Sequence, residues 1–192
     1  YLIATALTPE CRNMIRLFFA ITEAGKGAGR PKEIAEATFA KIGVLGAGMM
    51  GAGISYVTAM AGFDVVLLDM SQDSADKGKA NAADLLKKRV SRQRMDQETA
   101  DATLARIHAT ASFDDLAGCD LVIEAVFEDR AVKANVTKKA LAVTGDEIIF
   151  ASNTSTLPIT GLAAASSRPD NFIGLHFFSP VDRMPLVEII MG

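Results

Sequence analysis

The feature that most constrains the fold is a glycine-rich turn between an apolar segment and a segment of small residues. The stretch KIGVLGAGMMGAG places Gly46, Gly48 and Gly51 in the spacing G-x-G-x-x-G. The first glycine permits the tight turn, the second lets backbone amides approach a pyrophosphate, and the third lets the helix pack closely on the strand. The helix that follows, beginning at Met49 and Met50, would point its N-terminus at the phosphates of a dinucleotide.

A second apolar segment, DVVLLD, ends in Asp69, 18 residues after Gly51. A carboxylate at this position accepts hydrogen bonds from both hydroxyls of an adenosine ribose, and it repels a 2′-phosphate. The sequence therefore predicts NAD rather than NADP. Two alternatives stay open: a purely structural glycine turn, and an FAD site, which uses a similar fingerprint but for which we see no second flavin-binding segment.

Strand-like and helix-like segments alternate from residue 41 onward, which predicts a doubly wound, Rossmann-type α/β fold with a mostly parallel sheet. The helical region 72–106 is too long for one crossover helix. Met95-Asp96 interrupts it, and Asp96 can cap a second helix, so we expect two antiparallel helices after the second strand. The expected strands are 41–46, 64–69, 107–112, 120–126, 147–152 and 172–178.

The first 40 residues differ from the rest. Apolar residues recur at helical spacing between Thr8 and Ala24, which predicts an amphipathic helix that needs a partner surface. Residues 25–33 are rich in Gly, Lys and Pro and are typical of a linker. We expect a connector helix and linker over 1–40 and the dinucleotide-binding domain over 41–192.

Composition excludes several classes of partner. A net charge of −3 gives no broad positive field, so we expect no nucleic-acid partner. The N-terminal YLIATAL is too short to span a bilayer, so we expect no membrane insertion. Cys11 and Cys119 lack metal-ligating neighbours in the sequence, which favours reduced thiols and no metal site.

Polar residues follow several of the predicted strands, where ligands of doubly wound sheets bind. They are Glu128 and Lys133 after one strand, Asn153 and Ser155 after the next, and then His176 and Glu188. Ala125, near the end of the first of these strands, would pass close under the cofactor. Glu124 lies inside a predicted strand and needs a partner or solvent, and its role stays open.

A lone histidine in an apolar segment is usually a hydrogen-bonded core residue. Three features favour catalysis for His176 instead. They are a hydroxyl on the neighbouring strand, a carboxylate on the next strand and a nicotinamide site at the same edge. An imidazole hydrogen-bonded to a buried carboxylate has a fixed tautomer, which suits it to remove a proton from a carbinol. Ser155 would hydrogen-bond the same oxygen. No G-x-S-x-G motif is present, which argues against a serine hydrolase. The other histidine, His108, has no acidic neighbour in an obvious array and is expected to be structural.

Basic residues cluster in the first of the two predicted helices of region 72–106. They are Lys87, Lys88, Arg89, Arg92 and Arg94. Two interpretations stay open: a solvated helix face, or a platform for a phosphorylated substrate tail, since Arg and Lys pair well with phosphate.

Four separated segments resemble, in order and spacing, the NAD-binding domain of the 3-hydroxyacyl-CoA dehydrogenases. They are GVLGAGMMGAGI, VIEAVFED, ASNTSTLPI and GLHFFSPVDRMPLVEII, and they cover about residues 41–192. The ending DRMPLVEI and the first 40 residues most resemble the multifunctional fatty-acid oxidation enzymes, in which an enoyl-CoA hydratase domain precedes the dehydrogenase. The resemblance implies NAD-dependent oxidation of (S)-3-hydroxyacyl-CoA to 3-oxoacyl-CoA in β-oxidation. We expect a cytoplasmic, bacterial-type protein rather than a mitochondrial or peroxisomal one.

The resemblance also implies roles for residues. His176 would be the general base paired with Glu188, Ser155 would hydrogen-bond the substrate's 3-oxygen, and the basic helix would lie toward the CoA moiety. The residues that would contact NAD are Gly46, Gly48, Met49, Met50, Gly51, Asp69, Ala125, Glu128, Lys133 and Asn153.

This chain departs from the family pattern in its extent. The family has a C-terminal all-helical domain that supplies a catalytic asparagine, the acyl-binding wall and dimer contacts, whereas the sequence stops at Gly192. We therefore expect a fragment of a longer enzyme that binds NAD with little or no turnover. The alternatives are another NAD-dependent hydroxy-acid dehydrogenase and a dinucleotide-binding module without chemistry.

Overall fold

The structure is a computed structural model that describes residues 2–26, 31, 33–35, 37–145 and 147–192. It divides into two compact units, Tyr1–Thr38 and Phe39–Gly192. Most of the linker predicted at 25–33 lies outside the described residues. Among those residues, no helix has the length and apolar character needed to cross a membrane.

The N-terminal unit contains two helices, α1 (Leu2–Ala6) and α2 (Pro9–Gly25). Thr8 caps α2, because its Oγ1 accepts a hydrogen bond from the Cys11 backbone amide at 3.2 Å. No residue of α2 is buried, and the apolar side chains Met14, Leu17, Phe18 and Ile21 are all more than half exposed. The sequence pattern did not reveal α1.

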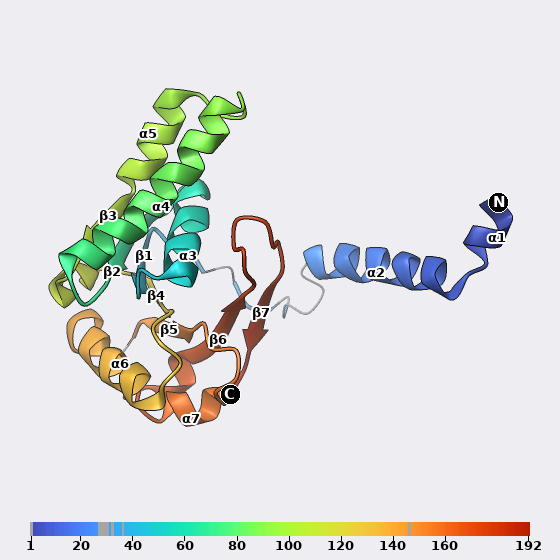
Figure 1. Ribbon diagram of the computed structural model, residues 1–192. Coiled ribbons are helices and arrows are strands. Elements are labelled where there is room, and N and C mark those ends of the chain that lie inside the picture. Colours follow the sequence, from blue (N-terminus) through green and yellow to red (C-terminus); the bar gives the residue numbers. More distant parts are fainter. Residues whose placement is uncertain (1, 27–30, 32, 36, 146) are drawn as a thin grey trace. The chain divides into compact units, whose positions relative to one another are not determined.

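The second unit is built on a seven-stranded sheet with the order β3-β2-β1-β4-β5-β6-β7 (Figure 1). The first six strands are parallel and β7 is antiparallel to β6. The doubly wound, mostly parallel sheet is therefore confirmed. The strands are β1 (Lys41–Leu45), β2 (Asp64–Leu68), β3 (Ile107–Thr110), β4 (Leu121–Glu124), β5 (Ile149–Ser152), β6 (Phe172–Phe177) and β7 (Val187–Ile190).

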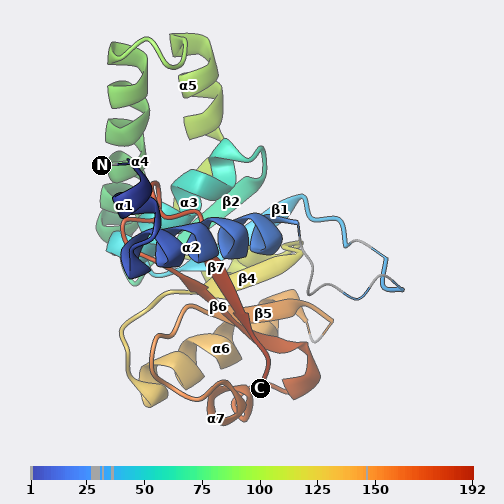
Figure 2. The same ribbon diagram turned by 90° about the vertical axis from the view of Figure 1, so that its right-hand side faces the viewer.

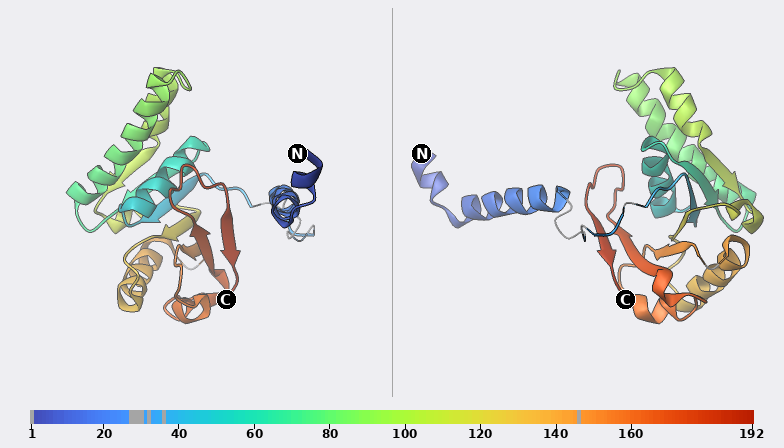
Figure 3. Two further views of the ribbon diagram at one scale, coloured as in Figure 1. Left: turned by 45° about the vertical axis from the view of Figure 1, so that its right-hand side comes forward. Right: turned by 180° about the vertical axis from the view of Figure 1, so that it is seen from behind.

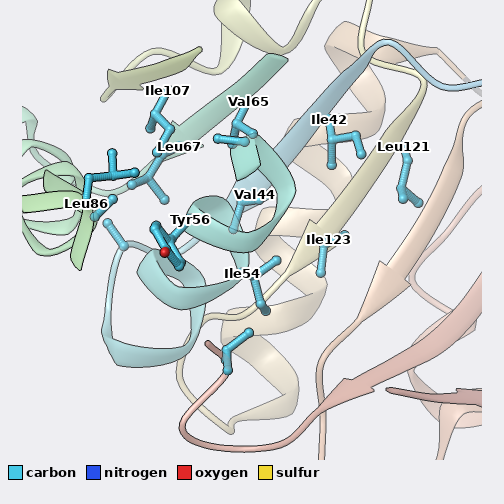
Figure 4. Close-up of a cluster of buried hydrophobic side chains, with 14 of the residues drawn as sticks. Ile42, Val44, Ile54, Tyr56, Val65, Leu67, Leu86, Ile107, Leu121 and Ile123 are labelled. Atoms are coloured by element: carbon cyan, nitrogen blue, oxygen red, sulfur yellow. The ribbon is translucent and has the colours of Figure 1, made fainter. Parts of the chain in front are cut away.

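Helices cover both faces of the sheet, and each face has its own apolar core (Figures 1 and 2). Alternate residues of a strand point to opposite faces. Val44 therefore packs with Ile54 and Tyr56 on one face (Figure 4), and Leu45 packs with Leu141 on the other. The helices are α3 (Met49–Met60), α4 (Gln72–Ser91), α5 (Gln97–Ala105), α6 (Arg130–Thr144) and α7 (Ile159–Ala163), with short 3₁₀ turns η1 (Phe113–Leu116) and η2 (Pro169–Asn171).

The predicted pair of helices after the second strand is present, and α4 and α5 lie side by side as a projecting hairpin (Figure 2). As predicted, Asp96 caps α5, because its Oδ1 accepts the Thr99 amide at 2.6 Å.

His108 was expected to have no acidic neighbour in an obvious array, and this was wrong. Its Nε2 lies 3.2 Å from Asp115 Oδ2, and Thr110 Oγ1 donates to the same oxygen. The acidic partner comes from η1, which folds back beside β3. These contacts join β3 to η1, which agrees with the structural role that we expected.

Strands β6 and β7 form a hairpin with a long connection, residues 178–186 (Figure 3). The connection packs back on α3 through Val181, which is buried against Gly53; an added Cβ at Gly53 would lie 3.0 Å from Val181. The register of the hairpin pairs His176 directly with Glu188.

Candidate active site

The glycine turn lies between β1 and α3, at the point of the sheet where the strand order reverses. Gly46 has a φ of +94°, a conformation that favours glycine, and its amide donates to the Leu68 carbonyl at 2.8 Å. At Gly51, an added Cβ would lie 1.7 Å from the Gly46 carbonyl oxygen. At Gly48, by contrast, an added Cβ would meet no described heavy atom within 4 Å. Gly46 and Gly51 thus serve the turn. Gly48 leaves open space at the N-terminus of α3, which fits the pyrophosphate of a dinucleotide.

Asp69 follows β2 and lies beside this turn. Its Oδ2 accepts the Ala47 amide at 2.6 Å, and its Oδ1 accepts the Met70 amide at 2.7 Å. The carboxylate therefore holds the glycine turn in place through the Ala47 amide. Each oxygen keeps a lone pair for a ribose hydroxyl.

A fully buried ion pair lies under the same edge. Glu124 ends β4 and is 1% exposed, and Lys133 on α6 is 2% exposed. Lys133 Nζ donates to Glu124 Oε1 at 2.8 Å, and the Ser152 hydroxyl donates to Glu124 Oε2 at 2.7 Å. The sheet register places Ser152 directly opposite Glu124. The partner that Glu124 required is thus Lys133.

Glu128 extends this network to the turn after β5. Its Oε2 lies 3.1 Å from Lys133 Nζ, and its Oε1 accepts a short hydrogen bond from Thr154 Oγ1. The same Oε1 accepts the amides of Ser155 at 3.2 Å and Thr156 at 3.4 Å. Burial acts to raise the pKa of Glu128, but these hydrogen bonds and the Lys133 charge outweigh it and lower the pKa to about 2.

Ser155, His176 and Glu188 form one continuous chain of contacts. Ser155 Oγ lies 3.1 Å from His176 Nε2, and His176 Nδ1 lies 2.8 Å from Glu188 Oε2. Because a carboxylate only accepts, Nδ1 carries the proton and Nε2 of the neutral ring is the acceptor. The expectation of a buried carboxylate was wrong, since the Glu188 side chain is 50% exposed, whereas His176 is 17% exposed.

This arrangement is not that of a serine hydrolase. The amides of Ser155 and Thr156 both donate to Glu128, so neither is free to stabilise an oxyanion. The chain of contacts is therefore suited to proton transfer at His176.

Two more predicted residues lie at this edge. Asn153 Oδ1 accepts the Phe177 amide at 2.8 Å, so its side-chain amide nitrogen is the group that remains able to donate to a ligand. Ala125 closes the opposite wall of the glycine turn, because an added Cβ at Gly46 would lie 2.8 Å from the Ala125 oxygen. Met49, at the start of α3, is 74% exposed, and Met50 packs against the core.

A basic cavity of about 570 Å³ lies between α4 and the β6–β7 connection. Four of the five predicted basic residues line it, and Lys87 does not. Sequence analysis missed Arg183 in this wall, since it lies in a loop whose folding back follows no periodic pattern. The lining residues are Tyr56, Leu85, Lys88, Arg89, Arg92, Arg94, Asp182 and Arg183.

The fold and the edge geometry define a dinucleotide-binding domain that carries a hydroxyl-histidine-carboxylate chain beside its cofactor site. Residues 41–192 match the family described as "3-hydroxyacyl-CoA dehydrogenase, NAD binding domain". The chain belongs to this family, and its cofactor is NAD.

Similar proteins agree with this assignment. The chain is 43% identical over 191 residues to a fatty acid oxidation complex subunit alpha of Psychrobacter arcticus, covering 97% of this chain and 26% of that protein. It is 48% identical over 156 residues to a 3-hydroxybutyryl-CoA dehydrogenase of Bradyrhizobium diazoefficiens, covering 81% of this chain and 53% of that protein. The crystal structure of (S)-3-hydroxybutyryl-CoA dehydrogenase PaaH1 from Ralstonia eutropha superposes with a TM-score of 0.78 at 41% identity, covering 81% of this chain and 55% of that one. The chain thus spans only about a quarter to a half of these relatives.

Proposed function

We propose that this chain is the NAD-binding and base-carrying part of an enzyme that oxidises (S)-3-hydroxyacyl-CoA to 3-oxoacyl-CoA in fatty-acid β-oxidation. The observation that carries the proposal is the contact chain from Ser155 through His176 to Glu188, at the same sheet edge as the glycine turn. NAD, when bound, accepts a hydride from C3 of the substrate.

His176 takes the proton of the 3-hydroxyl at Nε2, the nitrogen that its contact with Glu188 leaves as the acceptor. Glu188 fixes the ring orientation and stabilises the imidazolium that forms. When the substrate binds, the Ser155 hydroxyl turns from His176 Nε2 and donates to the 3-oxygen, which it orients. Asp69 binds the adenosine ribose, and the open space at Gly48 admits the pyrophosphate.

The basic cavity supports a CoA thioester rather than a free hydroxy acid as the substrate. Guanidinium and ammonium groups pair with phosphate, and Lys88, Arg89, Arg92, Arg94 and Arg183 converge there. A comparison of turnover with 3-hydroxybutyryl-CoA and with free 3-hydroxybutyrate separates this function from another hydroxy-acid dehydrogenase.

We also propose that a helical C-terminal dehydrogenase domain and a hydratase domain accompany this chain in its parent enzyme. The larger size of its relatives, including subunits of fatty acid oxidation complexes, supports this. A cytoplasmic, bacterial-type setting stays a prediction, in line with the bacterial origin of these relatives.

The cofactor part is tested by fluorescence titration of the chain with NADH and NADPH. We expect Asp69→Ala to weaken NADH binding and to relax discrimination against NADPH. The matched control is Asp64→Ala at the opposite end of β2, where the carboxylate pairs with Arg106 at 3.0 Å; its titrations should not change. Unchanged curves for Asp69→Ala would contradict the ribose assignment.

The catalytic part is tested in the parent enzyme. We expect His176→Ala to lower kcat by roughly 10²- to 10⁴-fold while the Kd for NADH changes little, because the residue acts in proton transfer. Turnover equal to that of the unmodified enzyme would remove His176 from the mechanism. If every preparation of the parent enzyme bound NADH but showed no turnover, a dinucleotide-binding module without chemistry would be favoured.

A further inference from the structure

The proposed function leaves Glu124 without a task, although burying its charge is costly. Glu124, Lys133, Ser152 and Thr154 are each at most 2% exposed. Buried ion pairs often stabilise a fold no more than apolar residues of the same volume do. A buried charge network is therefore better explained by the geometry that it fixes.

The network ends on the turn that carries Ser155. Glu128 Oε1 accepts hydrogen bonds from four donors in three successive residues: the Thr154 hydroxyl, the Ser155 amide, and the amide and hydroxyl of Thr156. Its other oxygen lies beside Lys133, whose Nζ also donates to Glu124.

The turn needs such an anchor. Ser155 is exposed and lies in the connection between β5 and α7, whereas His176 lies on β6. The 3.1 Å contact between them therefore depends on where the turn is held. Site geometries of this kind tolerate displacements of only about 0.5 Å.

We propose that Glu128 is a positioning residue that holds Ser155 against His176, and that Lys133 and Glu124 fix Glu128 for this purpose. The inference rests on the proposed function, in which Ser155 and His176 act together. It gives Glu128 and Lys133 a task that is separate from any contact with NAD.

The test uses the two histidines of the chain, His176 and His108. Long-range ¹H–¹⁵N spectra report the Nε2 resonance of each ring, and His108 serves as the internal reference. The variant Ser155→Ala shows where the His176 Nε2 resonance lies when the serine hydroxyl is absent. The test variants are Glu128→Gln, Lys133→Met and Thr154→Val. The last keeps every charge and the side-chain volume, so it remains informative if a charge variant does not fold.

We expect the three variants to move the His176 Nε2 resonance at least half of the way to its position in Ser155→Ala, with the His108 resonances unchanged. Thr144→Val is the matched control, because its hydroxyl bonds to the Ala140 carbonyl at the end of α6; it should leave both rings unchanged. One result would overturn the positioning role alone. In that result Ser155→Ala moves the His176 Nε2 resonance, but Thr154→Val and the folded charge variants leave it at its original position. If Ser155→Ala itself moves nothing, the Ser155–His176 contact is wrong, and the proposed function fails with it.

Discussion

Replacing Lys133 by Met should destabilise the fold far more than a single ion pair on the surface would. Lys133 Nζ lies 2.8 Å from Glu124 Oε1 and 3.1 Å from Glu128 Oε2. At an effective dielectric constant of about 20, two opposite charges 2.8 Å apart attract by about 6 kcal/mol. The cost of removing these charges from water offsets part of this attraction. Loss of the ammonium nevertheless leaves the Glu124 carboxylate buried without a counter-charge, so the free energy of unfolding should fall by roughly 3–5 kcal/mol.

The assay is urea denaturation followed by circular dichroism. Lys77→Met is the matched control, because Lys77 Nζ lies 2.7 Å from Asp73 Oδ2 but the two side chains are each 75% exposed; its denaturation midpoint should not move measurably. Combining Lys133→Met with Glu124→Gln should recover at least ~1 kcal/mol, because no uncompensated charge then remains at Glu124. A loss below ~1 kcal/mol for Lys133→Met would refute this reasoning.

Two further predictions concern acid and the glycine turn. The folded pKa of Glu128 is about 2, below its ordinary value of 4.5, so its stabilising contribution is complete above pH 4.5 and is lost as the pH falls toward 2. Denaturation across this window should show a smaller loss of stability in Glu128→Gln, and an equal loss would contradict the assignment. Gly48→Ala should keep the unmodified Tm but weaken NADH binding, because its Cβ enters open space, whereas Gly51→Ala should lower the Tm through contact with Gly46. Equal behaviour of these two variants would remove the distinction drawn between the glycines.

Much of the candidate site followed from the sequence, because the carboxyl ends of parallel strands meet at one edge. That rule placed Glu128, Asn153 and Ser155 together once the strands were recognised. The pairing of His176 with Glu188 has a different origin, namely the antiparallel register of β6 and β7. No periodic pattern reveals such a register.

The missed features depend on contacts between distant segments. Glu124 had no evident partner, because nothing in the sequence shows that Lys133 points into the protein rather than to solvent. The strand predicted at 107–112 ends at Thr110, because Ser112 caps the 3₁₀ turn η1. Arg183 enters the basic cavity only because Val181 anchors its loop on α3.

The most direct test is to titrate the ¹⁵N-labelled chain with NADH and to map the binding site from the chemical-shift changes of the chain's backbone amide and histidine ring resonances. The account predicts perturbations at Gly46, Gly48, Asp69 and Asn153 and at the His176 ring, with His108 unaffected. Saturable binding that perturbs the glycine turn but leaves the His176 ring unchanged would contradict the claim that one edge of the sheet brings the cofactor and the base together.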